Sequence, residues 1–597
     1  MGRILTSLAL FLCLFGAARA AQPSTDEIYP LDKLKPGQRG EVWTVFRGTE
    51  PEPFTVQVTG VVLNALGPGK SLILCELTDP PVQSMGAVAG MSGSPLYIEG
   101  KLAGALSYQI QRFETVHYAG FTPAADLVEV RTKMAAAYHA SNAVPVAGKS
   151  GTETAQPAMR NETASLSAEG VRPLRPVFTL SGISPVVADL FAPRLSALGL
   201  SATSLGGSLD SSADAAKVPA KALTPGSAVA VALTTGDITL AGTGTVSNVD
   251  GRSVTAFGHP MMSLGDVELP MCSAEIVTIL PSNMQSIKVA NTGPVIGTIT
   301  QDRLSAVSGM LGSGPAMTEV EVIVNTPSHP AKTLHFSVAR QEQLTPVLVA
   351  TGVSQAILGS NDAGLSNGFL LKSDVMFPTK PTLATRTLYA GPQGFQQGLS
   401  QFVQDLAQNL QNPYEKTFPR KVVFTVEALD QNPAVTLELF QLSRSTARAG
   451  EVVQATLSWR DYQGESHRQT IDIPIDAAWT GRTLDVVLAP GHVLDELTGR
   501  PRSIEAAQLR SFDAYLAAIQ DSRPADGLCI AVVERTSLFT DQANATPDAP
   551  SSIERIARGA DEARFNQVDA VIPLWESHVL GGKLSNASLR RPLKVVD

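Results

Sequence analysis

The chain has 597 residues and a formal net charge of −9, with 46 Lys and Arg against 55 Asp and Glu. Hydrophobic residues make up 44% of it, which excludes a largely disordered chain, and its length suffices for roughly three to five domains. The acidic balance and the lack of a long basic run argue against a nucleic-acid partner.

The first twenty residues have the pattern of a secretory signal peptide. Arg3 supplies the charged start, residues 4–16 the apolar stretch, and Ala18-Arg19-Ala20 a small-residue cleavage site. The apolar stretch is too short to span a bilayer, and no later segment is long and apolar enough to do so. We therefore expect an exported protein, periplasmic or extracellular, without a transmembrane anchor.

Short strands are predicted from about residue 28 to residue 130, where Phe54, Val56 and Val58 alternate with polar residues. A helix with Leu127 and Val130 on one face closes this region. The Ser-, Thr- and Ala-rich stretch that follows is typical of a flexible linker.

A helix near residues 184–198 opens the next unit, which becomes strand-rich from Ala228. A second helix with its apolar residues on one face is expected between Phe395 and Leu410. The alternating strands from 422 to 488 are typical of an immunoglobulin-type sandwich. The tail combines a helix with a buried strand at residues 528–533, and no internal repeat is convincing.

Three cysteines would remain after export: Cys75, Cys272 and Cys529. Their odd number and wide spacing argue against a zinc site, and each lies in an apolar strand-like run. We expect buried thiols, and the sequence leaves open whether two of them form a disulfide. No cofactor is predicted, because no glycine-rich phosphate loop or dinucleotide fingerprint follows a strand in the required way. No metal site is predicted either, since Asp266 and Glu268 share a strand face without a third ligand.

The string Gly90-Met91-Ser92-Gly93-Ser94-Pro95 lies between two strand-like runs. Its glycines leave the Ser92 hydroxyl uncrowded and allow the N–H groups of Gly90 and Ser92 to point at one spot, as in an oxyanion hole beside a nucleophile. It parallels the nucleophile loop of trypsin-like proteases. The same string also fits a Gly/Ser/Pro turn without any chemistry.

A second motif, Phe257-Gly258-His259-Pro260, carries the best candidate for a general base, because imidazole exchanges protons near neutral pH. Asp79, in Thr78-Asp79-Pro80, could orient that imidazole, and Asp266 is a local alternative. Each of these strings could equally be a structural turn.

These motifs together resemble the stage IV sporulation protein B (SpoIVB) peptidase family, serine endopeptidases related to the chymotrypsin clan. The serine string matches at every position, Thr78-Asp79-Pro80 stands where the family carries an aspartate, and Phe257-Gly258-His259 matches the base motif except that Pro260 replaces a glycine. The resemblance implies Ser92 as nucleophile, His259 as base, Asp79 as its orienting partner, and Gly90 and Ser92 as the oxyanion hole. In the family the histidine precedes the serine, whereas no histidine precedes Ser92 here. A base from His259 therefore requires a permuted or interleaved pair of barrels.

The expected fold is mainly β with peripheral helices, with trypsin-like β-barrel-type units plus a C-terminal immunoglobulin-like β-sandwich. The expected divisions are a signal peptide at 1–20, a protease-like β-domain at 21–140, a linker at 141–170, a second β-rich unit at 171–350, a helical connector at 351–420, a β-sandwich at 421–495 and an α/β tail at 496–597.

Two functions remain open from the sequence. The first is an exported serine endopeptidase that acts on a protein or peptide substrate through limited proteolysis, or on its own linker. The alternative is a catalytically inactive envelope binding or scaffold protein that keeps the protease-like fold.

Overall fold

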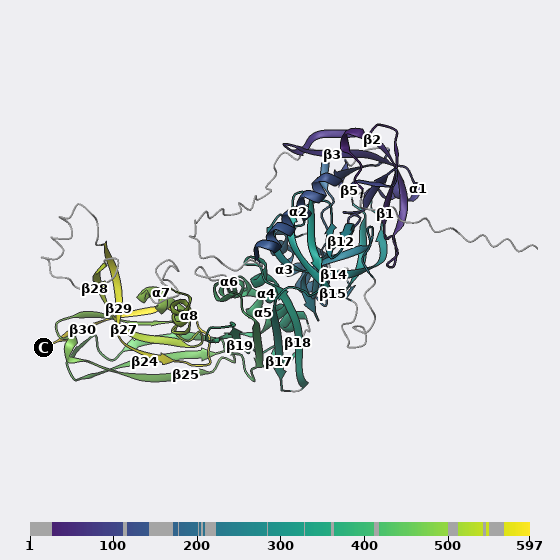
Figure 1. The fold of residues 1–597 in the computed structure, drawn as a ribbon. Helices are drawn as coiled ribbons and strands as arrows, with labels where there is room; N and C mark the ends of the chain where they lie inside the picture. The colour runs from purple at the N-terminus through teal and green to yellow at the C-terminus, as the bar shows by residue number, and fades with distance from the viewer. Residues whose placement is uncertain are drawn as a thin grey trace, which may run out of the picture.

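The computed structural model describes residues 27–110, 116–141, 171–176, 178–200, 202–203, 207–208, 222–282, 285–327, 329–359, 363–410, 417–499, 511–540, 545–547 and 566–597. The expected signal peptide, and the expected linker apart from Ser141, lie outside these residues. The described chain is mainly β, as the sequence predicted, with two barrels at one end and a sandwich at the other (Figure 1).

The first barrel closes a ring of six antiparallel strands in the order β1-β2-β3-β6-β5-β4, with β4 pairing back to β1. Its strands are β1 (Arg39–Thr44), β2 (Glu52–Gly67), β3 (Lys70–Leu77), β4 (Pro95–Ile98), β5 (Lys101–Ile110) and β6 (Tyr118–Pro123). The predicted alternation on β2 is confirmed, because Phe54, Val56 and Val58 are buried while the residues between them are exposed. The short helix α1 (Pro80–Met85) follows β3, and α2 (Ala124–Ser141) follows β6.

The second barrel repeats the same ring order, β11-β12-β13-β16-β15-β14, with β14 pairing back to β11. Its strands are β11 (Ala228–Gly236), β12 (Thr239–Asp250), β13 (Ser253–Ala256), β14 (Gly265–Leu280), β15 (Ile287–Arg303) and β16 (Ala306–Leu311). The two barrels therefore share one topology, although the sequence shows no convincing repeat. Strand pairing preserves the fold as long as the alternation of apolar residues is kept, so the repeat need not survive in residue identities.

Small side chains let the two barrels approach closely. On β11 the residues alternate between alanines, such as Ala228 and Ala230, and larger residues, such as Val229 and Val231. The larger residues enter the main core, whereas the alanines face a separate cluster that includes Val45, which directly follows β1. Close contact between backbones needs side chains of this size.

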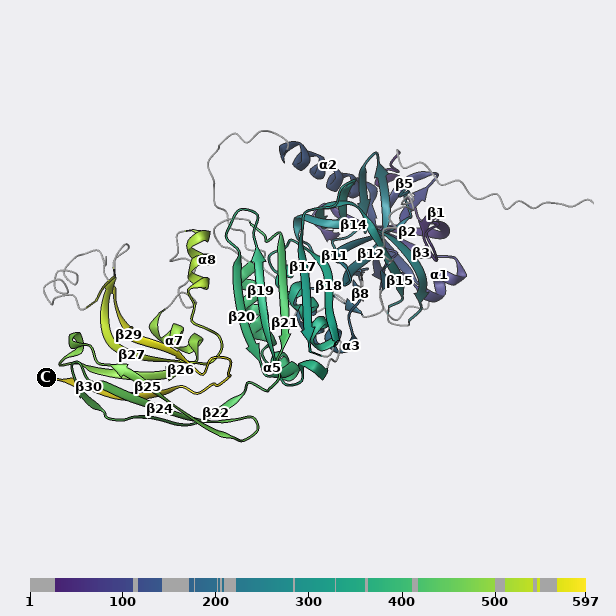
Figure 2. The same ribbon diagram turned by 90° about the horizontal axis from the view of Figure 1, so that it is seen from below.

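The barrel pair continues into a five-stranded sheet, ordered β18-β17-β21-β19-β20, through pairing of β18 with β11. Its strands are β17 (Met317–Thr326), β18 (His329–Ala339), β19 (Phe369–Met376), β20 (Leu383–Tyr389) and β21 (Lys421–Ala428). Its helices are α3 (Pro185–Ala197), α4 (Leu344–Ser354), α5 (Gly391–Gln397) and α6 (Leu399–Leu410), and the expected helices at 184–198 and 395–410 correspond to α3 and to α5 with α6. In Figure 2 this sheet lies between the barrels and the sandwich.

The C-terminal sandwich packs two sheets around one core. One sheet holds β22 (Val435–Leu442), β24 (Val452–Asp461) and β25 (Ser466–Pro474). The other holds β23 (Thr446–Arg448), β26 (Thr483–Ala489), β27 (Leu528–Thr540), β28 (Ala545–Pro547), β29 (Asn566–Val579) and β30 (Leu589–Val596), with α7 (Gly491–Thr498) and α8 (Phe512–Gln520) between its strands in sequence. The expected boundary at residue 495 therefore needs correction, because β27, β29 and β30 complete the sandwich. The expected start at 421 is also early, because β21 pairs with β17 and β19.

The three cysteines expected to be buried, Cys75, Cys272 and Cys529, are buried and free. Burial raises the pKa of the Cys75 thiol, and it raises that of Cys272 to about 12. Among the described helices, none combines the length and apolar character required to cross a membrane.

Candidate active site

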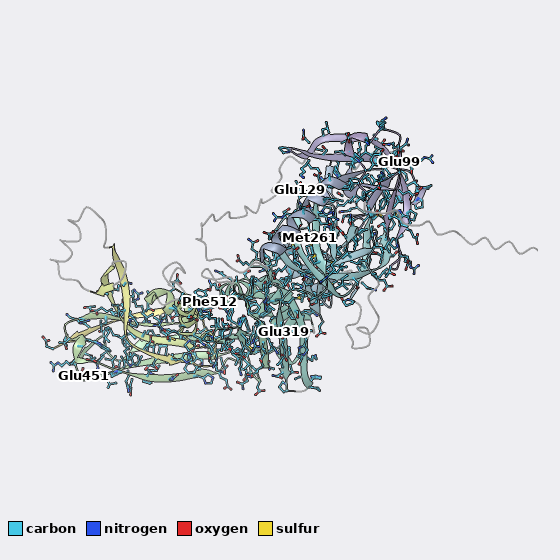
Figure 3. All side chains as sticks on the ribbon, in the orientation of Figure 1. Glu99, Glu129, Met261, Glu319, Glu451 and Phe512 are labelled. Atoms are coloured by element: carbon cyan, nitrogen blue, oxygen red, sulfur yellow. The ribbon has the colours of Figure 1, made fainter. Side chains whose placement is uncertain are left out.

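Ser92 and His259 occupy equivalent connections in the two barrels. Ser92 lies between β3 and β4, the third and fourth strands of the first barrel, and His259 lies between β13 and β14, the third and fourth strands of the second. Figure 3 labels Glu99, in the turn after β4, and Met261, in the loop after β13, on neighbouring barrels. The permuted arrangement that the sequence required is thus present at the level of topology.

The serine loop (residues 90–95) and the histidine loop (residues 257–264) are joined through β12. The amide of Thr245 donates to the carbonyl oxygen of Ser92 at 2.8 Å, and the Thr245 hydroxyl donates to the carbonyl oxygen of Gly90 at 3.0 Å. On the same edge of β12, the carbonyl oxygen of Thr245 accepts a hydrogen bond from the amide of Phe257 at 3.2 Å. One residue of the second barrel therefore contacts both motifs.

Gly93 is required by this close approach. Its φ is +97°, and a Cβ at this position would overlap the backbone oxygen of Thr245 and the backbone nitrogen of Phe257. Its amide donates to Leu106 on β5, and its carbonyl accepts from the Ser247 hydroxyl at 2.8 Å. The glycine after the serine is thus explained by packing between the barrels.

The Ser92 side chain is fully buried, and its hydroxyl has no hydrogen-bond partner among the described residues. The neighbouring Met91 and Gly93 amides donate to backbone carbonyls, whereas within the described part of the chain the Gly90 and Ser92 amides donate to no acceptor. A buried hydroxyl normally has a partner. The loop therefore presents three unsatisfied polar groups, of the kind that an oxyanion hole and a nucleophile need.

His259 is also fully buried, but its ring is held by the backbone. Nδ1 lies 2.7 Å from the carbonyl oxygen of Pro260, and Nε2 lies 2.8 Å from that of Leu174, which follows β7 (Val171–Pro173). Burial lowers the pKa of His259 to about 4. The neutral imidazole has one N–H, so one contact is a donated hydrogen bond and the other carbonyl faces a bare nitrogen. In this conformation neither ring nitrogen binds Ser92.

Asp79 does not contact the His259 ring nitrogens in this conformation either. It precedes α1, and its two carboxylate oxygens accept hydrogen bonds from the amide and the hydroxyl of Thr55 on β2, at 2.8 and 2.7 Å. The hydrogen bonds of a triad made of Ser92, His259 and Asp79 are therefore not formed in the described structure.

Asp302, which the sequence analysis missed, fixes the histidine loop. It lies near the end of β15, is almost fully buried, and accepts hydrogen bonds from the amides of Met261, Met262 and Leu264 at 2.7, 2.8 and 3.2 Å. Burial raises the pKa of Asp302, although these amides oppose the shift. No sequence motif marks the residue, because its partners are backbone groups 38 to 41 residues away.

The histidine loop also contains backbone strain. Phe257 and Gly258 have φ values of +68° and +66°, and Phe257 is fully buried. A bulky residue rarely adopts the left-handed region, where it costs about 1–3 kcal/mol. The Thr122 hydroxyl on β6 donates to the carbonyl of Gly258 at 2.6 Å, so the first barrel helps to hold the strained turn.

The described residues contain one group that could hold a metal ion, Asp461, Glu465 and His467, on the β24–β25 hairpin. Asp461 already closes this hairpin by accepting hydrogen bonds from the amides of Gln463 and Glu465 and from His467. Asp266 and Glu268 are the other acidic pair considered from the sequence. Of these two, Asp266 forms an ion pair with Arg303 at 2.6 Å.

Residues 14–121 match the family model of the SpoIVB peptidase S55. The first barrel resembles the SpoIVB peptidase family. The match includes Asp79, Gly90 and Ser92 and ends before the second barrel, so it does not extend to His259. No curated protein and no solved structure matches the chain.

We expect Gly93→Ala to destabilise the barrel pair by about 1–3 kcal/mol more than Gly100→Ala, because the first adds a Cβ in a packed space. Gly100 has a φ of +77° and open space around it, so it serves as a control for backbone strain alone. Hydrogen–deuterium exchange of barrel peptides in increasing urea measures the loss of stability in both variants. Equal losses would show that the two loops do not approach as described.

Asp302→Asn should destabilise the second barrel by about 1–3 kcal/mol, since the amide group cannot accept all three hydrogen bonds. Asp266→Asn is the matched control, because its exposed ion pair with Arg303 should contribute less than about 1 kcal/mol. The same exchange measurement, read on peptides that cover residues 257–265, tests the difference. A loss no larger than the control's would contradict the role of Asp302.

Acid should destabilise the wild-type protein more than His259→Gln. The pKa of His259 is about 4 in the fold and 6.5 ordinarily, so between these values the unfolded chain binds a proton that the folded chain does not. This contribution to stability is present above pH 6.5 and is lost as the pH falls toward 4. The stability advantage of the wild type over the variant, followed by urea unfolding from pH 7.5 to 4, should shrink accordingly. A constant difference would contradict the neutral buried imidazole.

Proposed function

We propose that this protein is a serine endopeptidase of the S55 type, with Ser92 as nucleophile where its two barrels meet. The observation that carries the proposal is the serine loop itself, where, among the described residues, a hydroxyl has no partner beside two amides that have no acceptor. The similarity of residues 14–121 to the SpoIVB peptidase S55 supports it. The predicted signal peptide would direct this activity outside the cytoplasm.

In the proposed reaction the Ser92 oxygen forms a bond to the substrate's carbonyl carbon and loses its proton to a base. The carbonyl's electron pair moves onto its oxygen, where the Gly90 and Ser92 amides stabilise the negative charge. The base then returns the proton to the amine as the C–N bond breaks. Water releases the acyl group by the same steps in reverse.

The base must come from another part of the chain, because residues 90–95 around Ser92 contain no titratable side chain. The family resemblance offers His259, with Asp79 to orient it. His259 can act only after its contact with Leu174 opens, and Leu174 directly follows β7 and the expected linker. Cleavage in residues 141–170 by an already opened copy of the chain is thus one route to an opened site, and the linker is then a substrate.

The test is labelling of the purified full chain with a fluorophosphonate, followed by intact mass and peptide mapping. We expect the wild type to gain one label on the peptide that contains Ser92. Ser92→Ala should gain none, because it lacks the side-chain oxygen that attacks the phosphorus of the probe. Ser84→Ala is the control: Ser84 is an exposed residue of α1 that donates to Pro81. If the wild type and Ser92→Ala label alike, Ser92 is not an activated nucleophile.

A second candidate function, an inactive binding or scaffold protein of the cell envelope, is favoured by the complete burial of Ser92 and by the backbone contacts of both His259 nitrogens. It predicts no labelling of the wild type. The large sandwich would then provide the binding surface.

A further inference from the structure

We infer that Lys288 is the group that accepts the proton of Ser92, in place of His259. This inference rests on the proposed function of Ser92 as nucleophile. It concerns a residue on β15 that lies 196 positions after the serine in sequence, outside every motif discussed above.

Lys288 packs against the serine loop. Its amide donates to the carbonyl of Ala89 at 2.9 Å, and the Ala89 amide donates to the carbonyl of Ser286 at 2.8 Å, so the start of β15 pairs with the residues before Gly90. A Cβ at Gly90, whose φ is +98°, would lie 2.9 Å from the Lys288 Cβ and 3.2 Å from its Cγ and Cδ. The lysine stem therefore runs directly along the glycine two residues before Ser92.

The Lys288 amine is buried, and the described residues give it no counter-charge. The residue is 4% exposed, and Nζ donates to the hydroxyl of Thr44, at the end of β1, at 2.7 Å. Among the described residues no carboxylate forms an ion pair with it. An ammonium group has three N–H donors, and a buried one normally has a carboxylate or several acceptors. A structural role alone does not explain this placement.

Burial lowers the pKa of Lys288 to about 7, and burial is the sole cause of the shift. No charged group on the surrounding elements contributes. The titratable residues there are Arg39 and Glu41 on β1, Asp79 on the connection that carries Ser92, Asp266, Glu268, Cys272 and Glu275 on β14, and Asp302 and Arg303 on β15. A lysine that is half deprotonated near neutral pH has a lone pair available as a base.

The protons balance in the proposed step. The neutral Lys288 amine takes the Ser92 proton as the Oγ–carbon bond forms, and the resulting ammonium gives that proton to the leaving amine as the C–N bond breaks. In the described conformation the Ser92 hydroxyl has no partner, so a bond to Nζ forms when a substrate docks and Lys288 turns from Thr44. Catalytic hydrogen bonds often shorten only in the substrate complex.

The test compares the rate of fluorophosphonate labelling at Ser92 in full-length wild type, Lys288→Met, His259→Gln and Lys35→Met, from pH 3 to 9. Methionine matches the length of lysine without the amine, and Lys35 is an exposed lysine that precedes β1 of the first barrel. We expect the wild-type rate to rise with pH, with a midpoint near pH 7. We expect Lys288→Met to label at least about 100-fold more slowly than the wild type. Lys35→Met should keep the wild-type midpoint.

A folding control accompanies this test. The Lys288 pKa is lowered in the fold, so between about 7 and 10.5 the unfolded wild type binds a proton that the folded wild type does not. Lys288→Met should therefore be more stable than the wild type at pH 7, with an advantage that shrinks as the pH rises toward 10.

The outcomes separate the two proposals. If the wild type labels at Ser92 and Lys288→Met labels within threefold of it, Lys288 is not the base, while the peptidase proposal stands. A wild-type midpoint near pH 4 that disappears in His259→Gln would also overturn the role of Lys288 and assign the base to His259. If the wild type does not label at all, both proposals fail together.

Discussion

The contact between the serine loop and β12 is the constraint on which the rest of the site depends. Along one edge of β12, Thr245 binds the backbone of Ser92, Gly90 and Phe257, and the close approach leaves no room for a side chain at Gly93. Because these bonds join backbone atoms of two barrels, they fix the relative position of both loops. Each barrel needs the other to define its loop.

The shared topology explains why the two motifs meet. In each barrel the connection from the third to the fourth strand carries the motif, so packing two like barrels against each other brings equivalent loops together. The order of the barrels along the chain does not affect this arrangement, since only the packing matters. A serine that precedes its partner loop by more than 160 residues is thus compatible with one site.

Buried polar groups are concentrated at this junction. Ser92, His259, Lys288 and Asp302 are all nearly inaccessible, and burial opposes the charged form of each titratable one. Asp302 recovers part of that cost through hydrogen bonds from three amides. Within the described part of the chain, the Lys288 amine binds one hydroxyl and the Ser92 hydroxyl has no partner. Burying a polar group without a hydrogen-bond partner costs free energy of folding, and such groups are typical of functional sites.

The sequence by itself determined the strand-rich character, the alternation on β2, the helices α3, α5, α6 and α8, and the serine string, because these depend on local periodicity and on glycine conformations. It also indicated that the base had to come from after Ser92. Only the tertiary structure decided that the barrels share one ring order, that β27, β29 and β30 complete the sandwich, and that Lys288 and Asp302 lie beside the two loops. These facts depend on strand pairing and on backbone partners far away in the chain, which leave no pattern in neighbouring residues.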